Sequence, residues 1–193
     1  MSNARRAKLE EAFSNSLIVK FYSPYEPGSV YGYVLDMGPE FFLLALIDDH
    51  IRFNGFQCYR VSDVRKLKTP APAAEFMTNA LRLRRESIDE KPDIDLSNIT
   101  ALLLSASQLF PLITIHREKM NPDTCKIGKL IEVNDSHLNF LEIDPDAIWA
   151  IKPTTVRLRD ITRIDFGGEY EEALHLVGGN PDHPRQIPDS QET

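Results

Sequence analysis

Histidine and cysteine side chains often bind metals or act as bases and nucleophiles, and this sequence spreads them thinly. None of its five histidines stands in a His-x-His or His-Glu-x-x-His arrangement: His50, His116, His137, His175 and His183. Cys58 and Cys125 are too far apart for a paired zinc motif, and we expect two reduced thiols. The chain also lacks a Walker loop, a Gly-x-Ser-x-Gly elbow and a Gly-x-Gly-x-x-Gly motif. We therefore expect no enzyme, with no catalytic residue, cofactor or metal.

One acidic segment, DPDAIW, places Asp144 and Asp146 close to Trp149. Two carboxylates could begin a calcium loop, but such a loop needs several more oxygen ligands and a glycine at its turn. A solvated hairpin tip is the better interpretation. Trp149 is either a core residue or an anchor on the surface, and its place in a β run favours the core.

Basic residues give the one indication of nucleic-acid binding. They gather towards the end of the first half of the chain: Arg60, Arg65, Lys66, Lys68, Arg82, Arg84 and Arg85. A cationic face of this kind can follow a phosphate backbone. A solvated face paired with local carboxylates is the simpler interpretation, because lysine and arginine cover most protein surfaces.

The 193-residue chain has a net charge of −7, and this charge is unevenly distributed. Residues 1–93 contain 13 basic and 13 acidic side chains, whereas residues 94–193 contain 9 and 16. An acidic balance disfavours loose binding to DNA or to an anionic membrane. No apolar run approaches the roughly 20 residues of a membrane helix, so we expect a soluble, cytoplasmic protein that does not contact a membrane.

Two segments of equal length follow the same pattern. GYVLDMGPEFFLLALID begins at Gly32 and GKLIEVNDSHLNFLEID begins at Gly128; each reads glycine, apolar residues, an acid, a polar turn and a second apolar run. The flanking segments SLIVKFY and PLITIHR, and also YRVSDVRKL and VRLRDITRI, recur at nearly the same separation. Self-similarity over this length indicates a duplicated domain.

Each copy reads as a helix followed by short strands. Helical spacing occurs in ARRAKLEEAF and in LSNITALLLSASQLF, and four or five runs rich in Val, Ile, Phe and Tyr follow each of them. The pattern predicts a mainly β fold of two tandem five-stranded small barrels, each preceded by a helix. We expect residues 1–90 and 91–176 to form these repeats, with Gly32 and Gly128 at bends, the Leu102–Leu104 cluster between the barrels, and residues 177–193 as a disordered tail.

This pattern resembles the Sm-like fold of Sm and LSm proteins and bacterial Hfq. The second copy is similar to the first Sm motif at Gly128, Leu130, Asp135, His137, Leu138, Asn139 and Phe140, and both copies keep the arginine of the second motif, at Arg157 and Arg60. The resemblance implies that single-stranded RNA contacts Asp135, His137, Asn139 and Arg157, with Arg60 in a degenerate second site. Both copies replace the glycine after that arginine, by Leu158 and Val61, which indicates a different loop conformation there.

The absence of catalytic motifs, the lost loop glycines and the acidic charge together favour a non-catalytic protein-interaction module whose partner the sequence does not name. The alternative is an RNA-binding Sm-like protein. Proteins of that family form rings by pairing strand edges. Here the segment 99–109 and a helix predicted after the last strand of each copy can cover those edges, so we expect a monomer or a homodimer.

Overall fold

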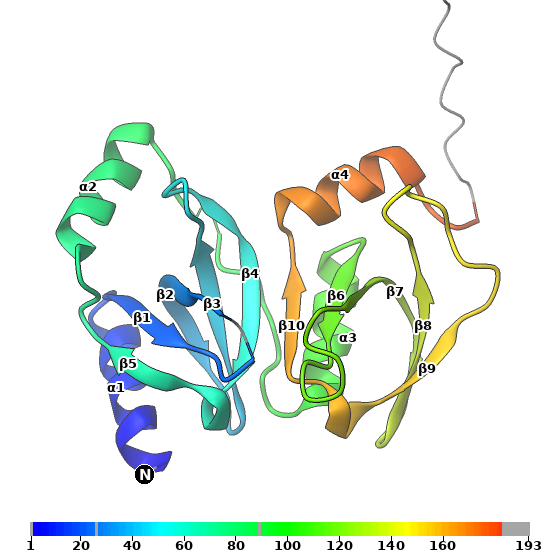
Figure 1. The fold of residues 1–193 in the computed structure, drawn as a ribbon, viewed down its shortest axis with the longest axis horizontal. Helices are drawn as coiled ribbons and strands as arrows, with labels where there is room; N and C mark the ends of the chain where they lie inside the picture. The colour runs from blue at the N-terminus through cyan, green and yellow to red at the C-terminus, as the bar shows by residue number, and fades with distance from the viewer. Residues whose placement is uncertain (1, 26, 89, 183–193) are drawn as a thin grey trace, which may run out of the picture.

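The computed structural model describes residues 2–25, 27–88 and 90–182. The first half contains α1 (Ser2–Ser14), β1 (Ile18–Tyr22), β2 (Ser29–Met37), β3 (Phe41–Ile47), β4 (Phe53–Arg60), β5 (Arg65–Lys68) and α2 (Ala74–Arg84). The second half contains α3 (Ile99–Leu109), β6 (Ile113–His116), β7 (Cys125–Val133), β8 (His137–Glu142), β9 (Thr154–Arg157), β10 (Arg163–Phe166) and α4 (Glu169–Gly178). A 3₁₀ turn precedes the last strand of each half, at Val61–Asp63 and at Leu158–Asp160. Figure 1 shows the two halves side by side, with β4 and β10 between them.

The ten strands belong to one open antiparallel sheet, in the order β5-β1-β2-β3-β4-β10-β6-β7-β8-β9. The prediction of two closed small barrels is therefore wrong. After β4 the chain turns away, and β5 pairs with β1 at the opposite edge of the first half, which leaves one edge of β4 open. β10 fills that edge and pairs with β6 on its other side. The first half thus satisfies the backbone groups of β4 through the second half rather than by closing on itself.

The two halves repeat the same order of strands and a similar pairing register. Val19 pairs with Gly32 as Ile113 pairs with Gly128, and a register shift follows each glycine at the same distance along the strand. A Cβ atom at either glycine would clash with a carbonyl oxygen of the neighbouring strand. Both glycines therefore permit a close approach between two strands. The repeated register supports the hypothesis of a tandem duplication.

Two hydrophobic cores lie on opposite faces of the sheet. Along β3, Phe42 and Leu44 belong to the core of the first half, while Phe41 and Leu43 belong to the core of the second half. Alternate residues of a strand point to opposite faces, so both faces of β3 are buried. This explains why the run FFLLALI contains no polar residue. The second core is therefore built from both halves of the chain.

One helix from each half completes these cores. α1 packs into the first core through Leu9, and α3 packs into the second core through Leu102 and Leu103. Leu104, which was expected in the same buried cluster, is exposed. The reason is geometric, because successive residues are about 100° apart around a helix and a third consecutive leucine leaves the buried side.

The predicted disordered tail begins too early in the sequence. α4 continues to Gly178, so the first two residues of that segment belong to a helix. Residues 183–193, which make up most of the predicted tail, lie outside the described residues. Within the described ranges, no helix is long and apolar enough to cross a membrane.

Candidate functional site

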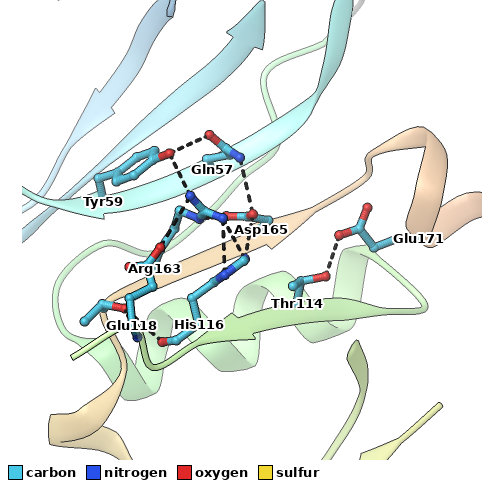
Figure 2. A network of polar contacts seen from close by, with 9 residues as sticks. Gln57, Tyr59, Thr114, His116, Glu118, Arg163, Asp165 and Glu171 are labelled. Atoms are coloured by element: carbon cyan, nitrogen blue, oxygen red, sulfur yellow. Dashed lines mark hydrogen bonds and ion pairs between the residues drawn. The ribbon is translucent and has the colours of Figure 1, made fainter. Parts of the chain in front are cut away.

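Polar side chains gather on one face of the sheet where the two halves meet (Figure 2). β10 lies between β4 and β6, so the pairing register places Arg163 between Tyr59 and His116, and Asp165 beside Gln57. The alternate residues of β10 face the second hydrophobic core on the other side of the sheet. We call this group the seam cluster, and it comprises Gln57, Tyr59, Thr114, His116, Glu118, Arg163 and Asp165.

Arg163 is the centre of the seam cluster. Its Nε atom lies 3.0 Å from Asp165 Oδ1, a charge contact outside hydrogen-bond geometry, and its Nη1 atom lies 3.6 Å from Glu118 Oε1. Nη1 also donates to the Tyr59 hydroxyl at 3.2 Å. The side chains of Arg163 and Glu118 are only 9% and 4% exposed. One buried cation therefore faces two carboxylates, and removing it would leave them uncompensated.

His116 joins the seam cluster through both of its ring nitrogens. Nε2 lies 2.9 Å from Asp165 Oδ2, and Arg163 Nη2 lies 3.2 Å from Nδ1 and 3.0 Å from Nε2. A neutral ring that is protonated on Nε2 donates to Asp165 and accepts from Arg163. Burial lowers the pKa of His116, but the charges of Asp165, Glu118 and Glu171 and the hydrogen bond to Asp165 outweigh it, and the net pKa shift is upward. Burial acts in the opposite direction on an acid, and it raises the pKa of the Glu118 carboxyl group.

Gln57 and Tyr59 connect the cluster to the first half. The Tyr59 hydroxyl donates to Gln57 Oε1 at 2.9 Å, and Gln57 Nε2 donates to Asp165 Oδ2 at 3.2 Å. Burial and two nearby carboxylates raise the pKa of Tyr59 well above its ordinary value, so its hydroxyl stays protonated. At the other end of the cluster, Thr114 Oγ1 donates to Glu171 Oε1 of α4 at 2.5 Å. The network therefore links β4, β10 and β6, and the separate Thr114–Glu171 bond connects β6 to α4.

His116 beside Asp165 has the arrangement of a general base. A base of this kind can activate a neighbouring thiol, but the thiol next to His116 is not activated. Cys125 lies opposite His116 in the register of β6 and β7. Cys125 is exposed at the start of β7, but partial burial of its thiol and the charges of Asp165 and Glu171 raise the pKa of the thiol, which keeps it protonated rather than nucleophilic. Across the described residues, no three His, Cys, Asp or Glu side chains form a group that could hold a metal. We interpret the seam cluster as a structural network that fixes β10 between the halves.

Four of the five predicted RNA-binding residues lie together around the β8–β9 hairpin. His137 pairs with Arg157 across the two strands. A shallow pocket there is lined by Asp135, Ser136, His137, Arg157, Leu158 and Arg159. Asn139 lies on the neighbouring part of the hairpin, where it accepts from the Thr155 hydroxyl at 2.9 Å and donates to Glu132 at 3.3 Å. Its amide group is thus already engaged within the sheet.

Arg60, the fifth predicted residue, does not join the other four. It ends β4 in the first half, forms an ion pair with Glu40, and donates from Nε to the Ile161 carbonyl oxygen at 3.1 Å. Its guanidinium lies over the Phe41 ring, 4.5 Å from the ring centroid. Burial lowers the pKa of Arg60. Arg60 therefore lies at the contact between the halves, where its guanidinium is already engaged within the chain.

The DPDAIW segment forms a tight turn, as the interpretation of a hairpin tip requires. Asp144 Oδ1 accepts from the backbone amides of Asp146 and Ile148, both at 2.9 Å. Trp149 is partly buried, and its Nε1 donates to the Gly178 carbonyl oxygen at 3.3 Å. This hydrogen bond connects the turn to the C-terminal end of α4.

Sequence patterns do not predict the seam cluster. Its members come from strands that are far apart in the chain, so no motif spacing connects them. The one local signal is the segment RIDF at Arg163–Phe166, where two charged residues alternate with two apolar residues as in a strand with one polar face.

The comparisons with known proteins give no match. The sequence matches no protein-family model and no curated protein, and no solved structure matches either. The proposals below therefore rest on the geometry and chemistry of this chain.

Proposed function

We propose that this protein is a non-catalytic module that binds another protein through an exposed apolar surface of its second half. The observation that carries the proposal is a group of large apolar side chains left exposed at α4 and at the turn beside it. We call this group the α4 patch, and it comprises Ile148, Ile151, Tyr170, Leu176 and Val177. Ile151 alone is 96% exposed. Gathered apolar surface of this kind is unfavourable in water and is typical of association sites.

The α4 patch borders two depressions. One lies between the DPDAIW turn and α4, and its lining includes Ile148, Trp149, Tyr170 and Leu174. The other continues along the same turn to Ile151. The hydrogen bond from the indole to α4 holds the floor of these depressions in place. A preformed concave surface with aromatic and aliphatic side chains offers anchor points for a partner and lowers the ordering cost of binding.

The turn that builds this surface has no counterpart in the first half. There, β3 and β4 are joined by a short turn in which the Asp48 amide donates to the Arg52 carbonyl oxygen at 3.0 Å. In the second half, residues 143–153 separate β8 from β9 and carry Ile148, Trp149 and Ile151. Surface connections vary more freely than the elements they join, and they often carry binding residues. The apolar side chains of this longer connection thus support a binding role for the second half.

Site-specific photocrosslinking tests the proposal. A benzophenone amino acid replaces Ile148 in one variant and Met120 in the control, because the two side chains are 63% and 64% exposed and are therefore matched in solvent access. We expect a discrete protein adduct from the Ile148 variant alone in a lysate of the source cells, unchanged by prior nuclease treatment. Equal adducts from both positions, or adducts that nuclease removes, would contradict the proposal.

RNA binding beside β9 is a second candidate function. It is supported by the placement of Arg157 next to His137, with Arg159 lining the same pocket, and by the resemblance of this segment to an Sm motif. The two arginines supply the local positive charge that a phosphate needs. Asp135 lines the same pocket and opposes that attraction.

The RNA-binding candidate is tested by replacing Arg157 with alanine. If the pocket binds single-stranded RNA, Arg157→Ala should weaken binding by about 1–3 kcal/mol. Affinity should also fall steeply as salt is raised. Fluorescence anisotropy with a labelled oligonucleotide measures both effects, and Lys8→Ala, which removes an exposed cation outside the pocket, is the control. Equally weak binding by all three proteins would rule this candidate out.

A further inference from the structure

α2 leaves an apolar face uncovered. Its inner side packs on the sheet through Leu81, which is buried. Phe76, Ala80 and Leu83 share the opposite side of the helix, because residues three, four and seven apart lie on one face. Leu83 is 78% exposed, and Phe76 is also exposed. Packing within one chain therefore does not account for the outer face of α2.

α4 follows the last strand of the second half as α2 follows that of the first, and it also leaves apolar side chains exposed. Leu174 is buried against the sheet. Tyr170 and Val177, four residues before and three residues after Leu174, lie along the edge of this buried side and are exposed. Both belong to the α4 patch, and they line the two depressions beside the DPDAIW turn.

The two helices carry opposite charges. α2 ends in a basic turn with Arg82 and Arg84, and α4 begins with Glu169, Glu171 and Glu172. These charges suit the dipole of each helix. They also make the pair complementary, because antiparallel packing of α2 on α4 places the basic end of one helix beside the acidic end of the other. α4 contains no lysine or arginine, so a second α4 would offer no such match.

We infer that the partner of the α4 patch is α2 of a second copy of this chain, packed antiparallel to α4; this inference rests on the proposed protein-binding function. Figure 1 shows α2 and α4 on the same side of the molecule, one on each half. A two-fold axis can therefore place α2 of each copy on α4 of the other, and two equivalent contacts close a dimer. In this arrangement Phe76 faces Val177, and Leu83 faces Tyr170, because both pairs of residues are seven apart along their own helix.

A pair of charged variants tests this inference. Phe76→Glu and Val177→Arg each introduce a charge at an exposed position, and the new charges suit the first turn of α2 and the last turn of α4, so both variants should fold. We expect the wild-type chain to sediment as a dimer. For either variant alone, the dimer dissociation constant should rise at least about tenfold.

Mixing the two variants in equal amounts is the decisive step. The mixture should recover the dimer, because the new carboxylate then faces the new guanidinium while the second contact keeps its wild-type residues. Met120→Glu, which adds a charge at an exposed apolar position outside both helices, should leave the dissociation constant unchanged. A mixture of folded variants that stays monomeric would overturn the inference. So would a wild-type chain that is monomeric at every concentration, whereas a crosslink from Ile148 to a different protein would leave the proposed function standing.

Discussion

Replacing Arg163 by methionine tests the energetics of the seam cluster. The substitution keeps much of the apolar stem but removes the charge that faces Asp165 and Glu118. Both carboxylates then remain in the interior without that cation, and breaking a buried ion pair in this way typically costs about 3–5 kcal/mol. A folded domain has only about 5–15 kcal/mol of stability. We therefore expect Arg163→Met to remove a large part of the free energy of unfolding.

A surface ion pair provides the matched control. Lys91 Nζ lies 2.6 Å from Asp36 Oδ2, a shorter distance than either charge contact of Arg163, but both side chains are partly exposed. Exposed pairs contribute only about 0–1 kcal/mol, because water screens them. Lys91→Met should therefore cost far less than Arg163→Met, although its ion pair is tighter.

Urea unfolding followed by circular dichroism at pH 7 measures both variants. The double variant Arg163→Met with Asp165→Asn should lose less than the sum of its single losses by about 1 kcal/mol or more, because the two residues share one network. A loss for Arg163→Met no greater than that for Lys91→Met would refute the reasoning that burial, rather than distance, sets the energy of these contacts.

Three further predictions concern single positions. Asn98→Ala removes the cap of α3, whose side-chain oxygen accepts from the Ala101 amide at 2.9 Å, and should lower the free energy of unfolding by about 0.5–2 kcal/mol in urea. Gly128→Ala forces a Cβ into the backbone of β8 and should cost about 1–3 kcal/mol by thermal melting. Gly28→Ala, with open space around it, should change stability by less than about 0.5 kcal/mol. The raised pKa of His116 adds stability below its unfolded pKa, near 6.5, and this contribution is lost as pH rises through the folded pKa. The stability difference between wild type and His116→Gln should therefore be larger at about pH 5.5 than at about pH 8.5, and a difference that grows with pH would contradict this assignment.

Local elements could be predicted because the residues that specify them lie close together in the sequence. The apolar spacing in LSNITALLLSASQLF predicts a helix with Ser97 or Asn98 as its cap, and the structure shows α3 there with Asn98 as the cap. The repeated segments that begin at Gly32 and Gly128 form β2–β3 and β7–β8 with matching registers. In these cases the spacing of apolar residues and the turn residues contain the necessary information.

The pairing of β4 with β10 could not be predicted in the same way. The partner of β4 is decided by strands that lie about a hundred residues further along the chain, and nothing in the segment FNGFQCYR indicates whether its free edge pairs with β5 or with β10. One signal was present, because the wholly apolar run FFLLALI is typical of a strand covered on both faces. A strand of an isolated small barrel would be expected to show polar residues on its outer face.

The candidate sites differ in the same respect. The Sm-like resemblance grouped His137 with Arg157, and these two residues lie together because the neighbouring strands β8 and β9 pair them. The seam cluster was not predicted, because Arg163 meets Tyr59 and His116 only after two non-local strand pairings have formed. The α4 patch was also missed. The sequence shows Ile148 and Ile151 in a β run, and only the structure shows that this segment projects beside a helix.

The position of β10 affects how the chain can fold during synthesis. Although it is the last strand in the part of the chain that the structure describes, it occupies the middle of the sheet and pairs with β4 on one side and β6 on the other. Until residues 163–166 are available, both of those strands present unpaired edges, and such edges are sites of aggregation. The long sequence separation between β4 and β10 also slows their pairing. A chain that ends before Arg163 therefore carries two incomplete sheets, and we expect the nascent chain to depend on chaperones until β10 is made.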